Sequence, residues 1–150
     1  MRLAVSSDPI DPRAVESDVR APGYGGVVTF LGTVRQRSAD GREIDALDYE
    51  AYGEMAVTEM QAIAREVRER FGDVRLAMVH RTGEVEAGGV AVVVAAAAVH
   101  RREAFEACSY AIDALKSRAP IWKKERYAGG TSRWLTNGCD GSDESDATCR

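Results

Sequence analysis

The sequence predicts an α+β fold in which helices pack on a mixed, largely antiparallel sheet. Two strand-like segments precede each of two helix-like segments, so the order is strand, strand, helix, strand, strand, helix. The chain has 150 residues, 45% of them hydrophobic, which is enough for one well-packed core. The last sixteen residues contain few apolar side chains. We therefore expect a single domain over residues 1–134 and a disordered acidic tail over residues 135–150.

The first two strands are predicted by alternating apolar residues. Residues 25–35 (GGVVTFLGTVR) alternate apolar with small or polar types and are rich in β-branched side chains. Residues 46–51 (ALDYEA) alternate again, with Leu47 and Tyr49 on one face. The polar segment between them contains the turn signal Asp40-Gly41. We expect these two strands to form a hairpin with a long loop.

The middle of the chain predicts a helix and two further strands. Apolar residues at three- and four-residue spacing predict a helix over residues 53–71, which Gly72 ends. Residues 74–80 and 90–99 read as strands separated by a glycine-containing turn. The second of these strands is almost wholly apolar, so we expect it to be buried on both faces.

A second helix is predicted by the spacing of Phe105, Cys108, Ile112 and Leu115. Pro120 must end it, because proline lacks the amide proton and disfavours helical geometry at the preceding residue. Lys116 then lies in the last turn, close beside Phe105 on the helical wheel and at the edge of the apolar stripe. A lysine there is expected to snorkel or to be partly desolvated.

Charge is unevenly distributed along the chain. Residues 100–126 net +3, although the whole chain nets −4. The tail nets −3, so the remaining residues net only −1. A local positive excess is typical of an anion-binding site, whereas a nucleic-acid-binding protein would need a broad basic surface. We expect no nucleic acid as a partner.

Several other classes of protein are excluded by what the sequence lacks. It has no apolar run long enough to span a membrane and no secretory signal, so we expect a cytoplasmic protein without a membrane partner. Three cysteines without CxxC or Cys/His spacing predict neither a disulfide framework nor a metal site. Cys108 is expected to be a small buried thiol rather than a nucleophile.

The basic segment has both a functional and a structural interpretation. Lysines and arginines beside an imidazole can hold a phosphate together with a carboxylate-like anion, and a partly buried lysine can assist proton transfer or covalent chemistry. For Arg102, Arg118 and Arg126 we favour simple surface solubility. For Lys116 the two interpretations remain open. His80 and His100, each taken alone, are interpreted as histidines that bond a backbone carbonyl.

Five blocks of sequence together resemble a known family. They are GVVTFLGTVR at residues 26–35, LDYEAY at 47–52, HRTGE at 80–84, HRREAF at 100–105 and LKSRAPIWKKE at 115–125. In order and spacing they are similar to the signatures of the large, catalytic subunit of molybdopterin synthase. The resemblance covers roughly residues 23–134, and it implies a hammerhead-like arrangement of the predicted elements. One block alone would mean little.

The resemblance implies a reaction and its partners. Enzymes of this family transfer sulfur from the C-terminal thiocarboxylate of a small ubiquitin-like subunit to cyclic pyranopterin monophosphate, forming the dithiolene of molybdopterin. They are homodimers within a heterotetramer, and the large subunit requires no metal or other cofactor. Both reactants are anionic where they react, which gives the local positive charge a physical reason.

The resemblance also implies the site residues. Lys116 and Lys123 are expected to be catalytic: Lys116 stabilises the anion and assists proton movement, and Lys123 binds substrate and stabilises charge during transfer. Thr33 stands where some family members have lysine, so a hydroxyl or backbone contact would replace a charged one. The expected substrate-binding residues are Thr33, Val34, Arg35, His100, Arg101, Lys116, Lys123, Lys124 and Glu125.

Two other functions remain as alternatives. A non-catalytic module that binds a phosphorylated metabolite would use the same arginines without a special Lys116. A structural protein that docks an acidic partner would depend more on Arg118 or Lys124 than on Lys116. Assays of sulfur transfer and of association separate these alternatives from the synthase.

Overall fold

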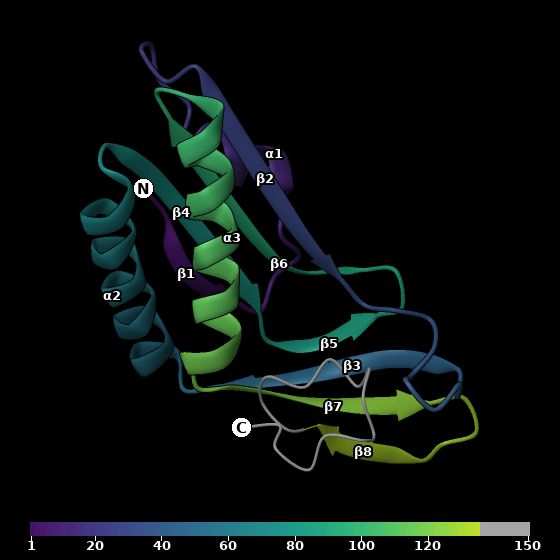
Figure 1. The fold of residues 1–150 in the computed structure, drawn as a ribbon. Coiled ribbons are helices and arrows are strands. Elements are labelled where there is room, and N and C mark those ends of the chain that lie inside the picture. Colours follow the sequence, from purple (N-terminus) through teal and green to yellow (C-terminus); the bar gives the residue numbers. More distant parts are fainter. Residues whose placement is uncertain (136–150) are drawn as a thin grey trace.

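Residues 1–135 are described by the computed structural model, in which two four-stranded sheets meet at an angle beneath a pair of helices (Figure 1). The elements, in chain order, are β1 (Leu3–Ser6), α1 (Pro12–Ser17), β2 (Gly26–Thr33), β3 (Ile44–Ala51), α2 (Gly53–Phe71), β4 (Val74–Arg81), β5 (Gly83–Glu86), β6 (Val90–Ala98), α3 (Arg101–Arg118), β7 (Ile121–Tyr127) and β8 (Ser132–Leu135). The α+β class and the largely antiparallel pairing are as predicted.

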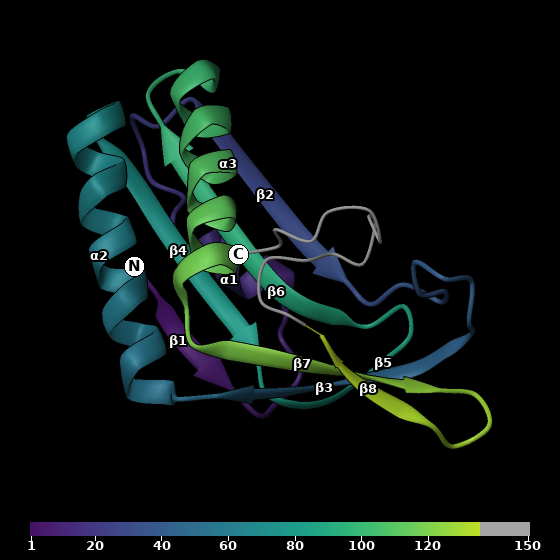
Figure 2. The same ribbon diagram turned by 60° about the horizontal axis from the view of Figure 1, so that its bottom comes forward.

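The first sheet, in the order β1-β4-β6-β2, is covered by helices on both faces. Only the β1–β4 pair is parallel. Helices α2 and α3 lie on one face and α1 on the other (Figures 1 and 2). Along β6, Val94 and Ala96 belong to the apolar cluster with α2 and α3, whereas Val93 and Ala95 belong to the cluster with α1. The prediction that this strand is buried on both faces is confirmed.

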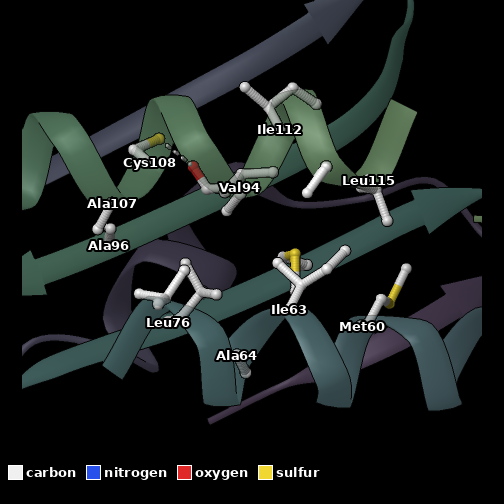
Figure 3. Packing of buried hydrophobic residues seen from close by; sticks show 14 of the residues in the cluster. Met60, Ile63, Ala64, Leu76, Val94, Ala96, Ala107, Cys108, Ile112 and Leu115 are labelled. Atoms are coloured by element: carbon white, nitrogen blue, oxygen red, sulfur yellow. Dashed lines mark hydrogen bonds between the residues drawn. The ribbon is translucent and has the colours of Figure 1, made fainter. Parts of the chain in front are cut away.

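The larger cluster fills the space between α2, α3 and the sheet. Figure 3 shows side chains of this cluster, among them Ile63 of α2, Ile112 of α3, and Leu76 and Val94 of the sheet. The Cys108 thiol donates to the Val94 carbonyl over 3.5 Å, and burial raises its pKa to about 11. A thiol this poorly ionised is a weak nucleophile, so Cys108 is a packing residue, as predicted.

The second sheet, in the order β5-β3-β7-β8, is antiparallel throughout. It lies across the lower end of the first sheet (Figures 1 and 2). Its apolar side chains form a separate small cluster. The buried members of that cluster are Val34, Ile44, Leu47, Val85, Ala91 and Tyr127.

The predicted hairpin is wrong. Strand β2 pairs with β6, and β3 pairs with β5 and β7, so the two strands belong to different sheets. The segment between them crosses from one sheet to the other, which a turn signal alone does not reveal. Strand β5 occupies the region predicted as a turn. The short elements β1, α1, β7 and β8 were not predicted.

Helix α3 ends as predicted, and Cys108, Ile112 and Leu115 of its predicted apolar stripe are buried. Ala119 has extended geometry (φ −68°, ψ 136°) directly before Pro120. The buried face also contains small residues such as Ala104, Ala107 and Ala111, whereas Phe105 is 63% exposed. Including Phe105 in the core was therefore wrong.

The predicted tail falls almost entirely outside the described residues. Leu135, its first residue, is the last residue of β8, and residues 136–150, with Cys139 and Cys149, lie beyond the described part. Among the described helices, none is both long and apolar enough to cross a membrane.

Candidate active site

A cavity of about 310 Å³ opens where the two sheets meet below the C-terminal end of α3. This volume lies at the lower end of the range for small-molecule sites. The ends of β2, β4 and β6 contribute to its wall from the first sheet, and β3 and β7 from the second. Its titratable lining residues, among those described, are Arg35, Tyr49, His80, Lys116, Lys123 and Glu125.

The break at Pro120 places two lysines on one cavity. The Ala119 amide donates to the Leu115 carbonyl over 3.0 Å and closes the helix. The chain then turns into β7, where it pairs with β3. Lys116 in the last turn of α3 and Lys123 opposite Tyr49 both line the cavity. The predicted pair of catalytic lysines therefore shares one site.

The alternation of β7 separates its charged residues into two groups. Lys123 and Glu125 line the cavity. Lys124 lies on the other face, with its Nζ 5.2 Å from the centre of the Trp134 ring. Arg126, on that same face, pairs with Glu84 over 2.6 Å. Of the expected residues on this strand, the structure brings Lys123 and Glu125 together and directs Lys124 elsewhere.

Residues after β2 bring an arginine to the cavity. The Val34 amide donates to the Gly89 carbonyl over 2.9 Å, and the Val34 carbonyl accepts from the Gly88 amide over 2.7 Å. The Val34 side chain is buried in the small cluster of the second sheet. Thr33 and Arg35, on either side of it, line the cavity. Val34 thus holds the backbone from which Arg35 extends.

Glu125 is a buried carboxylate among cations. Its side chain is 2% exposed, and its Oε2 receives no hydrogen bond from the described residues. The charge of Glu125 adds to burial in raising the pKa of Tyr127. A buried carboxylate oxygen without a partner is costly, so it offers a strong acceptor to a ligand that donates a proton.

His80 lines the same cavity, which the sequence interpretation did not predict. It follows Leu76 and Met78 on the face of β4 that packs under α2 and α3. Alternation along the strand was the signal available in the sequence, because it places His80 on the same face as those two core residues. Tyr49 lies against it, with ring centres 5.0 Å apart.

His100 and Arg101 lie at the opposite end of α3. His100 is the N-cap and Arg101 the first residue of the helix, and both are exposed. At 1.5 Å per residue, the helix separates them from Lys116 by about 24 Å. They do not line the cavity of their own chain.

The other arginines of the basic segment form surface ion pairs. Arg118 bonds Glu59 and, over 2.7 Å, Glu66 on α2. Arg102 bonds Glu106 one turn further along α3 at 3.0 Å. None of these arginines lines the cavity of its own chain, which agrees with the surface role favoured for Arg102 and Arg118.

The cavity is suited to binding anions. Among the lining residues that the structure describes, there are three positive charges, on Arg35, Lys116 and Lys123, and one carboxylate, on Glu125. An arginine fork and two flexible ammonium groups can bind a phosphate and a second anion side by side. Within residues 1–135 no three His, Cys, Asp or Glu side chains are grouped to hold a metal ion.

Comparisons with known proteins agree with this geometry. Residues 5–118 match the family described as MoaE protein. The chain is 47% identical over 107 residues to the molybdopterin synthase catalytic subunit of Pyrococcus abyssi, covering 71% of this chain and 72% of that one. It is 39% identical over 131 residues to molybdopterin synthase catalytic subunit 1 of Mycobacterium tuberculosis, covering 87% and 88%.

A solved structure shares the fold. The crystal structure of molybdopterin synthase from Staphylococcus aureus superposes with a TM-score of 0.86 at 32% identity. The match covers 90% of this chain and 97% of that one. The similarity therefore includes both sheets and the helices that form the cavity.

Proposed function

Because the chain belongs to the MoaE family, that of molybdopterin synthase catalytic subunits, we propose that its cavity is the site of sulfur transfer in molybdenum cofactor biosynthesis. The sulfur donor is the C-terminal thiocarboxylate of a small ubiquitin-like carrier subunit, and the acceptor is cyclic pyranopterin monophosphate. The product is the dithiolene of molybdopterin. One observation carries the proposal: Lys116 and Lys123, from opposite sides of Pro120, line one cavity with Arg35.

The two lysines have complementary roles in this proposal. Lys116, on the exposed last turn of α3, meets the incoming thiocarboxylate, stabilises its charge and assists proton movement as sulfur leaves the acyl carbon. Lys123, on the wall formed by β7, holds the substrate and stabilises the charge that develops on it. An extended carrier terminus can reach an exposed lysine, whereas a lysine within a sheet is held in a fixed position.

The remaining cavity residues bind the substrate. Arg35 extends from a backbone held on both sides of Val34, so its guanidinium can make a fixed bidentate contact with the phosphate. Thr33 offers a hydroxyl at the same wall. Glu125 accepts hydrogen bonds from the amino and ring N–H groups of the pterin. Lys124, on the outer face of β7, supports the rim electrostatically.

His100 and Arg101 take part across the dimer. Since α3 holds them about 24 Å from Lys116 of the same chain, they can bind substrate only when another subunit presents them. A two-fold axis beside α3 would place the N-terminal end of one helix near the C-terminal end of the other. The proposed assembly is a homodimer of this chain with one carrier subunit for each cavity.

The proposal includes the catalytic domain and the location. Residues 1–134 form the domain that catalyses the reaction, and the acidic tail is outside it. The protein works in the cytoplasm. The carrier receives its sulfur elsewhere, so the cavity has to bind only the two anionic reactants and water.

Reconstitution with purified components tests the function. The protein is mixed with thiocarboxylated carrier and cyclic pyranopterin monophosphate, and the dithiolene is measured. The control uses the same carrier with an ordinary C-terminal carboxylate, which contains no sulfur to transfer. Product with the first carrier and none with the second is expected. No product with verified reagents would overturn the proposed function.

A further inference from the structure

His80 is held in one tautomer at the cavity wall. Its Nδ1 lies 2.8 Å from the carbonyl oxygen of Arg81. A carbonyl can only accept, so Nδ1 carries the proton and Nε2 carries the lone pair. No described residue donates a hydrogen bond to Nε2. The ring therefore presents a proton acceptor to the cavity that it lines.

The surroundings keep this imidazole neutral. Burial is the largest cause that lowers the pKa of His80, and together with the positive charges of Lys123 and Lys116 it brings this pKa to about 4, against the opposing effect of the bond to Arg81. The edge of the Tyr49 ring, inclined by 69°, fixes its orientation. A neutral imidazole has a lone pair, which the ammonium and guanidinium groups around it lack.

The reaction needs a base at this place if the proposed function holds. Once the carrier sulfur has bonded to a substrate carbon, the carrier remains attached as an acyl thioester. To release it, a water oxygen must bond to the acyl carbon while the acyl carbon–sulfur bond breaks and its electron pair goes to sulfur. Water loses a proton as it attacks, and the sulfur can take one up. A group that accepts the first proton and returns it to sulfur would assist both halves.

We propose that His80 is a catalytic residue that accepts, through Nε2, the proton of the water that releases the carrier. The imidazolium then donates this proton to the departing sulfur, and the carrier is left as a carboxylate after losing its second proton to solvent. This role rests on the proposed function and adds a base that is distinct from the two lysines.

Charge in the cavity favours this role when the reactants are bound. Lys116 of α3 and Lys123 of β7 face the imidazole, Arg35 after β2 lines the same cavity, and Glu125 is its acidic group. The thiocarboxylate and phosphate neutralise these cations when they bind. Once neutralised, the cations no longer lower the pKa of His80, so His80 is a stronger base at the stage when water must be activated.

Two substitutions separate the functions of the ring nitrogens. His80→Asn keeps an N–H near the position of Nδ1 and removes the atom at Nε2, whereas His80→Gln extends an amide towards the Nε2 position. Neither amide is a useful base. In single-turnover reconstitution, both variants should form the carrier–substrate thioester, detected by mass spectrometry, and should release it about 100-fold more slowly. Arg102→Gln, on the exposed side of α3, is the matched control and should release it normally.

The possible outcomes distinguish this role from the proposed function. Normal release by both His80 variants, beside an active wild type, overturns the role of His80 alone. Failure of the variants to form the thioester, with unchanged melting, also overturns it because His80 would then act in binding. A wild-type chain that forms neither thioester nor product overturns both proposals.

A measurement on the wild-type protein needs no variant. Release of the carrier should slow as the pH falls and His80 becomes protonated, while formation of the thioester should change less. Because the pKa of His80 is about 4 before the reactants bind, the fall in rate should lie at or above that pH, and a release rate that stays constant as the pH is lowered to about 4 would contradict a base of this kind.

Discussion

The two sheets of this molecule differ in what covers them. The first has helices on both faces, and its central strand β6 is almost wholly apolar. The second has one small apolar cluster, and its strand β7 carries four charged side chains in a row, Lys123 to Arg126. The first sheet can therefore be rigid, whereas the second can place charges because many of its side chains reach solvent.

The cavity lies where these two properties meet. The helical layer supplies fixed ends for Lys116 and His80, and the second sheet supplies Lys123 and Glu125 in alternating register. Rigid elements hold functional groups more precisely than loops do. The comparison suggests that the helical layer determines stability and that the charged wall determines activity, and each prediction below tests this division.

The largest expected effect is on activity. Lys116→Ala should lower dithiolene formation at least about 100-fold, because it removes the cation that we propose meets the thiocarboxylate. The melting temperature should change little, since Lys116 is exposed. Rates and thermal melts of the same preparations check this. Ser117→Ala, the next residue on the exposed end of α3, is the control; full turnover by Lys116→Ala would instead favour the metabolite-binding alternative.

The second prediction compares one leucine from each sheet. Leu76 is 1% exposed in the large cluster, so Leu76→Ala should lower the free energy of unfolding by about 3 to 4 kcal/mol. Leu47 lies in the small cluster beside the cavity, where neighbours can relax, and Leu47→Ala should cost about 2 kcal/mol. Urea unfolding measures both. Equal losses would contradict the division between a stabilising layer and a functional wall.

The same contrast explains how much of the fold the sequence predicted. Strand β6 and helices α2 and α3 were found because their apolar residues follow a clear period. Strand β7 was not, because its IWKKERY sequence has charged residues on both faces. The pairing of β2 with β6 joins segments some sixty residues apart along the chain, and local turn signals carry no information about such contacts.

The candidate site shows a similar limit. The resemblance named Thr33, Arg35, Lys116, Lys123 and Glu125, and the structure brings all five to one cavity. The resemblance did not single out His80 or Tyr49. These two residues line the cavity only because of the strand face on which they lie. His100 and Arg101 show the converse: they belong to the same helix as Lys116, but helix length places them at the other end.

The third prediction concerns acid stability. Because burial lowers the pKa of His80 from 6.5 to about 4, the unfolded chain binds this proton more readily than the folded chain does between those values. Stability from this group is complete above about pH 6.5 and is lost as the pH falls towards 4. From pH 7 to pH 5 the loss is about 2 kcal/mol.

The His80→Gln variant isolates this contribution. It should show a smaller difference between urea unfolding at pH 7 and at pH 5 than the wild type shows. This histidine belongs to the helical layer and also lines the cavity. We therefore expect its replacement to change both stability and activity, unlike that of Lys116 or Leu76. An identical pH dependence in the two proteins would contradict the neutral state assigned to His80.

The smallest expected effect is at the surface of the helical layer. Arg118, with help from the Tyr110 hydroxyl, lowers the pKa of Glu66 to about 2. Stability from this carboxylate is present above its ordinary pKa and is lost as the pH falls towards 2. Since about a third of both side chains is exposed, solvent and salt screen the pair, and Glu66→Gln should lower the melting temperature only slightly at neutral pH.

The difference from wild type should shrink below about pH 4 and in high salt, as measured by thermal melts. A loss as large as that of Leu76→Ala would mean that ion pairs, rather than apolar packing, hold α2 against α3.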